Sequence, residues 1–366
     1  MQPIDPAYQT IYSELEQRCL DAAFVQDFPA DGRFVSMESK GRRYWYFDRG
    51  SHQTRKRVYV GPVDDPEIAK RVTDFKDLKA NIAARRKLVT TLVRDGLLPS
   101  PTRDAGDVIA ALAEAGLFRL RGVLVGTTAF QCYAALLAVR LSGAVLQTSD
   151  ADFAQFHSIS AAVGDSIPPI LEILRAVDPS FRELPHQANS QKSTRFKSRS
   201  GFTVEFLVPN TSSDDYTGRP APMPALGLAS AEPLRFLDFL IYEPVRAILL
   251  HGPGVPVLVP SPARYAVHKL IVSSRRRGGD QSRTKSLKDL QQVQILIEAF
   301  DQRRLSDEFA AAYAEAFDRG PHWREAIVGG FEGLTSEVKG SMRRLLQKGF
   351  DRLKRPASAY LSQLAD

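Results

Sequence analysis

Two carboxylates one residue apart, Asp150 and Asp152, form the pattern in this chain that points most directly to chemistry. They follow the run 143–147, which we expect to be a strand that ends at this pair. Side chains alternate along a strand, so both carboxylates should project from one face. Two like charges held side by side are unfavourable unless a positive charge lies between them. A hard cation such as Mg²⁺, bound through carboxylate and phosphate oxygens, would supply that charge.

A glycine turn lies upstream of the two carboxylates. The apolar segment 122–125 predicts a strand, and Gly126, Thr127 and Thr128 follow it directly. The stretch 131–137 then predicts a helix. Glycine allows a tight turn between the strand and the helix and a close approach of the main chain to a neighbouring group.

A Gly-Thr turn that opens a helix, followed by a strand that closes in Asp-x-Asp, resembles the polymerase-β-type nucleotidyltransferase fold. The resemblance extends from about Gly122 to about Phe300. The residue pattern is most similar to a bacterial branch known only as nucleotidyltransferase-fold proteins. That branch is distantly similar to the abortive-infection toxin nucleotidyltransferases. The resemblance implies an α/β (α+β) fold with a mixed sheet and covering helices. It also implies that phosphate groups are bound by Gly126, Thr127 and Thr128. It further implies that Mg²⁺ or Mn²⁺ is bound by Asp150 and Asp152.

A third carboxylate, Glu205, stands in the apolar run 202–208, where a charge without a partner is unfavourable. We expect this run to form the next sheet strand. The resemblance implies a third metal-binding carboxylate on that strand, although the family usually has Asp there. Two interpretations therefore stay open: Glu205 completes the metal site and helps to take the acceptor's proton, or it has a structural role.

A helix expected to begin after Ser261 carries a further candidate, Lys269. Lys269 lies on the apolar side of this helix, where a lysine needs a partner, and a triphosphate would be one. The resemblance supports this interpretation, because related enzymes carry a helix lysine that faces the nucleotide. The neighbouring His268 could act as a general base, with a histidine at the core edge as the alternative.

The next helix is expected to start at Lys285 and to carry Asp289 in its first turns. Its inward residues should be Leu287, Leu290, Val293, Leu296 and Ile297. The resemblance implies that the acid at the head of this helix supports the nucleotide-binding site. The alternative for Asp289 is an acid that the helix dipole favours near an N-terminus. Asp238 is a carboxylate candidate of lower rank.

Basic residues outnumber acidic ones and give a net charge of +7. A polyanionic partner is therefore compatible with the composition. The basic residues gather in 187–204, which we expect to be a loop, and in 275–288. Each cluster could equally be a solvated surface.

The N-terminal part predicts a helix over 5–25, a hairpin over 32–47 and a third strand over 57–61. Aromatic and basic residues alternate in this small sheet: Arg42, Arg43, Tyr44, Trp45, Tyr46, Arg55, Lys56, Arg57 and Tyr59. Such a surface can stack on exposed bases. The alternative is that the aromatic residues pack on the long helix expected from Pro66 to about residue 92.

The linker 99–102 marks a domain boundary, which divides the chain into an N-terminal module (1–102), a catalytic domain (103–300) and a helical C-terminal region (301–366). Cys19 and Cys132 are expected to be buried, reduced thiols. No apolar run is long enough for a membrane span, and the first residues lack the pattern of a signal peptide, so a cytoplasmic protein is expected.

These expectations converge on a Mg²⁺-dependent nucleotidyltransferase. It would transfer a nucleoside monophosphate from a nucleoside triphosphate, such as ATP, to an acceptor hydroxyl. RNA, for example a tRNA 3′ end, is the favoured acceptor. The alternative is a catalytically silent protein of the same fold that binds nucleic acid or acts in a toxin–antitoxin pair. The sequence makes no prediction of oligomeric state.

Overall fold

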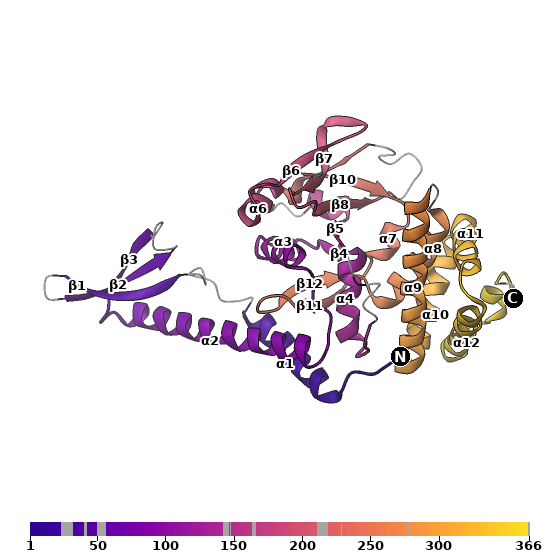
Figure 1. Cartoon of the computed structure of the whole chain (residues 1–366), viewed down its shortest axis with the longest axis horizontal. Coiled ribbons are helices and arrows are strands. Elements are labelled where there is room, and N and C mark those ends of the chain that lie inside the picture. Colours follow the sequence, from indigo (N-terminus) through magenta and orange to yellow (C-terminus); the bar gives the residue numbers. More distant parts are fainter. Residues whose placement is uncertain are drawn as a thin grey trace.

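A narrow N-terminal arm extends from a broad α/β body in the computed structural model (Figure 1). The C-terminal helices cover the side of the body that lies away from the arm. The structure describes residues 1–22, 32–39, 42–49, 56–141, 146, 148–162, 166–210, 219–227, 229–276 and 279–364.

The arm is a small antiparallel sheet carried on a long helix. The sheet has the order β1–β2–β3. One of its faces packs on the helix, because the rings of Phe34 and Phe47 lie edge-on to Phe75, at 5.1 and 5.5 Å between centroids. The elements are α1 (Pro6–Ala22), β1 (Arg33–Ser39), β2 (Arg42–Arg49), β3 (Lys56–Pro62) and α2 (Pro66–Arg94). The expected hairpin, third strand and long helix are thus present.

A hydrophobic cluster of its own joins α1 and the end of α2 to the body. It includes Leu15 of α1, Leu92 of α2 and Ile248 of the body. The Tyr12 hydroxyl accepts a hydrogen bond from the Ile248 N–H at 2.9 Å. Cys19 belongs to the same cluster and, like Cys132, is a buried free thiol, as expected.

The body is built on a mixed sheet of order β4–β5–β8–β10–β9, with the hairpin β6–β7 attached to β8. β5 and β8 are parallel, whereas β4 is antiparallel to β5. This register places Val125 and Glu205 on either side of Asp152. The strands are β4 (Val123–Val125), β5 (Asp150–Ala154), β6 (Arg182–His186), β7 (Asn189–Lys197), β8 (Thr203–Pro209), β9 (Ala221–Met223) and β10 (Ala229–Leu234).

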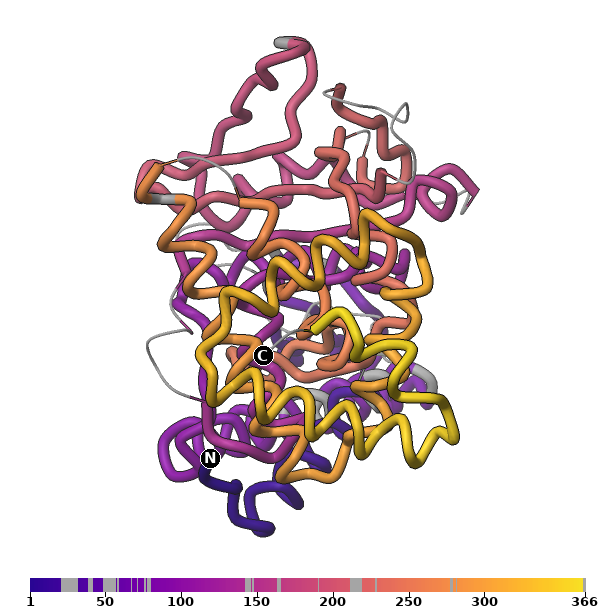
Figure 2. The backbone as a smooth tube through the Cα atoms, turned by 90° about the vertical axis from the view of Figure 1, so that its right-hand side faces the viewer, coloured from indigo at the N-terminus to yellow at the C-terminus, as the bar shows by residue number. Residues whose placement is uncertain are grey.

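Helices and a separate strand pair enclose this sheet, and a single hydrophobic cluster runs through the body from Ala105 to Leu364. Figure 2 looks onto the C-terminal helices, with the β6–β7 hairpin above them. These elements are α3 (Arg103–Glu114), α4 (Gly126–Leu136), α5 (His157–Ala162), α6 (Ile170–Val177), α7 (Leu237–Leu240), β11 (Val245–Leu249), β12 (Val255–Val259), α8 (Pro262–Arg275), α9 (Asp280–Arg303), α10 (Ser306–Asp318), α11 (Pro321–Glu332), α12 (Ser336–Leu353) and α13 (Ser358–Leu361). The chain is therefore a mixed α/β protein, as predicted, while the proposed domain limits stay a prediction.

The strand that carries the carboxylates differs from the expectation. β5 begins at Asp150, so the Asp-x-Asp pair opens this strand instead of closing one. Most of the run expected to be that strand, residues 143–145 and 147, lies outside the described residues. Both carboxylates nevertheless belong to one strand and share a face.

Three further expectations about local structure are wrong. The basic segment 187–204, expected to be a loop, contains the strand β7, in which Thr194 and Phe196 are buried. The sequence also predicts a strand over 239–241, but this run lies in and after the short helix α7, because a short apolar run has no period that separates strand from helix. The runs 247–250 and 255–260 are expected to extend the main sheet, but the strands formed there, β11 and β12, pair with each other instead.

One residue of helix α9 that was expected to face inward does not do so. Leu287 is 63% exposed, whereas Val293, Leu296 and Ile297 are buried. With 3.6 residues per turn, Leu287 lies about half a turn away from Leu296, so it faces solvent.

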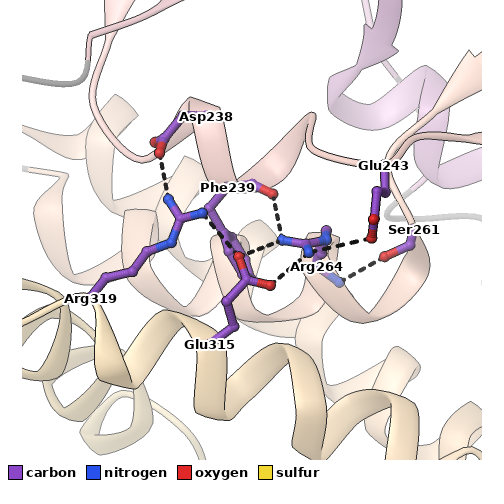
Figure 3. Close-up of polar contacts among 7 residues, drawn as sticks. All are labelled: Asp238, Phe239, Glu243, Ser261, Arg264, Glu315 and Arg319. Atoms are coloured by element: carbon purple, nitrogen blue, oxygen red, sulfur yellow. Dashed lines mark hydrogen bonds and ion pairs between the residues drawn. The ribbon is translucent and has the colours of Figure 1, made fainter.

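A buried arginine connects α7, α8 and α10 (Figure 3). Arg264 donates to both carboxylate oxygens of Glu315, at 3.0 and 2.6 Å, and to the Phe239 carbonyl at 3.2 Å. Arg319 bonds the same Glu315 at 2.9 Å and forms an ion pair with Asp238. The carboxylate of Asp238 is thus part of this structural cluster, on a different element from Asp150 and Asp152. No helix formed by the described residues is long and apolar enough to cross a membrane.

Candidate active site

Gly126 joins β4 to α4 in a left-handed backbone conformation, with φ of +71°. A Cβ atom built at this position would lie 2.7 Å from Oδ2 of Asp152. The main chain of the turn and the carboxylate are therefore in direct contact. Glycine is needed here for its backbone conformation and for the space that the carboxylate takes.

Asp150 and Asp152 are half-buried on β5. The Thr148 hydroxyl donates a hydrogen bond to Oδ1 of Asp150. Burial, and then the negative charges of Asp150 and Glu205, raise the pKa of Asp152 to about 7. The site thus concentrates negative charge that its own cations only partly balance, which is the condition that favours a bound cation.

Glu205 lies beside Asp152 as its register partner on β8. Arg195 of β7 donates from Nε to Oε1 of Glu205 at 2.7 Å. Burial raises the pKa of Glu205, although the hydrogen bond and charge of Arg195 oppose the shift. The structure therefore gives Glu205 an arginine partner that the sequence interpretation did not include.

Lys269 and Asp289 meet next to this site. The Lys269 Nζ lies 2.6 Å from Oδ1 of Asp289, and Nε of Arg276 lies 2.6 Å from Oδ2. Burial alone would raise the pKa of Asp289, but the charges of Lys269 and Arg276 outweigh it and hold that pKa below the ordinary value. The charge of Lys269 also reaches Asp152, where it opposes the raised pKa.

Tyr265 is a site residue that the sequence interpretation missed. Its hydroxyl oxygen lies 3.0 Å from the Gly126 carbonyl and 3.0 Å from Oε1 of Gln292. The Lys269 ammonium lies 5.3 Å from the centre of its ring. Tyr265 thus connects the glycine turn to α8 and α9. Its position four residues before Lys269, on the same helix face, is the signal that could have identified it.

The remaining candidates differ in their surroundings. Thr127 is half-buried, whereas Thr128 is 1% exposed and its Oγ1 has no hydrogen-bond partner among the described residues. Burial, and then the charge of Lys269, lower the pKa of His268 to about 3. A histidine with so low a pKa is a weak base, which disfavours the general-base alternative.

Among the residues that the structure describes, no group of three or more His, Cys, Asp or Glu side chains is arranged to hold a metal ion. Asp150 and Asp152 lie on one strand and raise each other's electrostatic cost, whereas Glu205 of the neighbouring strand bonds Arg195.

Comparisons with known proteins bear on this site. Residues 103–318 match the model of a family described as "Nucleotidyltransferase". No curated protein matches the chain. The crystal structure of an antigenic nucleotidyltransferase-like protein from Paracoccidioides brasiliensis is similar over 63% of this chain and 94% of its own, with 16% identity and a TM-score of 0.29. The family match spans more than half of the chain and includes the glycine turn, the carboxylates and Lys269, so the chain belongs to the nucleotidyltransferase family.

Proposed function

We propose that the chain transfers a nucleoside monophosphate from a nucleoside triphosphate to an acceptor hydroxyl. One observation carries this proposal: the glycine turn and the carboxylate pair form one site, because the Gly126 main chain lies against Asp152. A phosphate held at the turn would therefore be next to the carboxylates. Family membership supports the same reaction class.

The carboxylates Asp150 and Asp152 fit a Mg²⁺ or Mn²⁺ site of a particular kind. Mg²⁺ is usually held by one or two carboxylates together with substrate phosphates, and a complete cage of protein ligands is not required. Burial and the negative charges of Asp150 and Glu205 raise the pKa of Asp152 to about 7, so a bound cation would favour the ionised form of this pair. When bound, such an ion would neutralise the phosphates and make the acceptor hydroxyl more acidic.

Other residues would bind and orient the triphosphate. The first turn of α4 contains no acidic residue, and its N-cap Val125 makes no side-chain cap, so the helix start can offer N–H groups to phosphate oxygens. Thr127, which is half-buried, would add a hydroxyl donor, whereas the Thr128 hydroxyl is buried in the body. Lys269 would neutralise phosphate charge, and Asp289 would hold its ammonium in place.

The acceptor would approach from the β8 side of the carboxylates. We assign the acceptance of its proton to Glu205, whose raised pKa suits that role better than an ordinary carboxylate would. RNA is the favoured acceptor, with a tRNA end as one case, because the adjoining β6–β7 hairpin and the turn that follows it present the exposed basic residues Arg182, Lys192, Arg195 and Arg199.

The test uses labelled nucleoside triphosphates, ATP first, with Mg²⁺ and total RNA. The Asp152→Asn variant is compared with wild type, and Asp77→Asn, an exposed aspartate on α2, is the matched control. Label on RNA with wild type and Asp77→Asn, but not with Asp152→Asn, would support the whole proposal.

Other outcomes of the same experiment are equally informative. Label on the protein or on a small molecule would keep the transfer reaction and replace the acceptor. Transfer by a folded Asp152→Asn protein would overturn the assigned site. No transfer to any acceptor by wild type would favour the alternative of a silent protein that binds nucleic acid or acts in a toxin–antitoxin pair.

A further inference from the structure

The small sheet of the arm sorts its aromatic residues by face. Phe34, Trp45 and Phe47 lie on the face that packs on α2, with Phe34 and Trp45 at 6.4 Å between ring centroids. The tyrosines of the sheet lie on the other face, where Tyr59 is next to Tyr44 and Tyr46 at 5.9 and 5.6 Å. This separation follows from the period of two along β2 and β3. Purely apolar packing on α2 would not require a tyrosine cluster on the opposite side.

The tyrosine face is open to solvent. Tyr59 is 56% exposed and Met37, on the same face of β1, is 42% exposed. Tyr44 and Tyr46 are half-buried. The sheet stands at the far end of the arm, at a distance from the body (Figure 1). Rings held by each other and by the sheet present their flat surfaces with little loss of freedom on binding.

Positive charge accompanies the tyrosines. The register places Arg33, Arg42 and Arg57 on the tyrosine face, together with a single described carboxylate, Asp48. Arg57 forms hydrogen bonds with Asp48 at 2.7 and 3.2 Å, and Nε of Arg33 lies 3.9 Å from the same carboxylate, so one negative charge faces three arginines. Arg33 and Arg42 are exposed and leave the face positively charged. The face is therefore complementary to an anion that also has flat, stackable groups.

We propose that this face binds single-stranded nucleic acid, with bases stacked on Tyr44 and Tyr59 and backbone phosphates on Arg33 and Arg42. A single strand fits better than a duplex, because stacked and paired bases are not accessible to tyrosine rings. An acidic protein would satisfy the arginines but would not use the stacked tyrosines. The claim that this face holds an RNA acceptor rests on the proposed function. The claim that the face binds single-stranded nucleic acid does not depend on the transfer reaction.

The test measures binding of fluorescent oligouridine to the full chain by anisotropy, without triphosphate or metal. In Tyr44→Ala/Tyr59→Ala, the affinity should fall at least about tenfold, since each stacked base contributes on that order. Tyr44→Phe/Tyr59→Phe keeps both rings and should bind within about twofold of wild type. Tyr242→Ala removes a tyrosine that is 50% exposed on the body and should have no effect.

Folding and charge are tested separately. Tyr59→Ala alone removes the most exposed of the rings, and it should weaken binding without lowering the melting temperature. Arg42→Ala should reduce the salt dependence of binding by about one phosphate contact. The proposal is overturned if wild type does not bind oligouridine, if it prefers a duplex, or if the folded double alanine variant binds as wild type does.

The Asp152→Asn variant separates this proposal from the proposed reaction. It should bind oligouridine with wild-type affinity, because Asp152 lies in the body and not in the arm. Absent transfer with binding that depends on the tyrosines would reject the reaction and keep this surface. Transfer to RNA, together with oligouridine binding that does not depend on the tyrosines, would keep the reaction and reject this surface.

Discussion

The contact between Gly126 and Asp152 gives the sharpest test of the site, through the variant Gly126→Ala. The added methyl would begin 2.7 Å from Oδ2 of Asp152, and this oxygen would have to retreat to at least 3.4 Å, where ordinary contact begins. The backbone at this position would keep its left-handed conformation, which alanine adopts at a cost of about 1–2 kcal/mol. Two effects are therefore expected, one on stability and one on the carboxylate.

The first effect is a change in the free energy of unfolding, and the second is a change in the transfer rate. The strain should lower the free energy of unfolding by about 1–2 kcal/mol. The displaced carboxylate should lower the transfer rate about tenfold to a hundredfold, since a misplacement near 1 Å costs up to about a hundredfold in rate. Steady-state transfer from labelled ATP measures the rate, and thermal melting measures the stability.

Gly252→Ala is the matched control. Gly252 also has a positive φ, of +55°, but a Cβ there would meet nothing within 4 Å. This variant should lose a similar amount of stability and keep its transfer rate. The reasoning is refuted if folded Gly126→Ala transfers at the wild-type rate, or if both variants lose activity equally.

Four further predictions follow from the same contacts. Asp152→Asn should abolish transfer while the melting temperature holds or rises, because it removes a carboxylate that burial and its neighbours disfavour. Tyr265→Phe should cost about 1–2 kcal/mol of stability and weaken the ATP-dependent rise in melting temperature, because the Gly126 carbonyl loses its partner; an unchanged rise would contradict the role given to this hydroxyl. Glu315→Gln should destabilise the fold by about 1–2 kcal/mol, measured by urea unfolding, because Arg264 loses the carboxylate that bonds two of its nitrogens and, among the described carboxylates, keeps only that of Glu243 at 3.9 Å. Asp289 has a lowered pKa in the folded chain, so its contribution is complete above about pH 4 and is lost as the pH falls further; the difference in melting temperature between wild type and Asp289→Asn should close only in that acidic range, and closure near neutral pH would contradict it.

Local patterns predicted many elements well. The long helix α2 begins at Pro66 as predicted, and α8 begins after Ser261, whose side chain accepts a hydrogen bond from the Arg264 N–H. Such features depend on period and on cap residues a few positions apart, so the sequence contains them directly. The hairpin β1–β2 is of the same kind.

Contacts between distant strands could not be predicted in this way. Arg195 and Glu205 are register partners on β7 and β8, but Arg195 stands in a segment whose composition is typical of a loop. The sequence placed Glu205 on a strand near Asp152 and could not show that an arginine would bond it. The hydrogen bond between the Tyr265 hydroxyl and the Gly126 carbonyl joins α8 to α4, and it could not be predicted for the same reason.

The position of Asp-x-Asp within its strand shows how topology completes the site. β4 is antiparallel to β5, so Gly126, which follows the end of β4, comes next to the beginning of β5. β8 is parallel to β5, so Thr203 and Glu205, near its own beginning, reach the same edge of the sheet. A strand that ended in Asp-x-Asp, beside the same antiparallel β4, would hold its carboxylates at the edge opposite to the glycine turn. The predicted site, with Asp150 and Asp152 beside the Gly126 turn, is therefore compatible with this sheet only because the two aspartates stand at the beginning of β5.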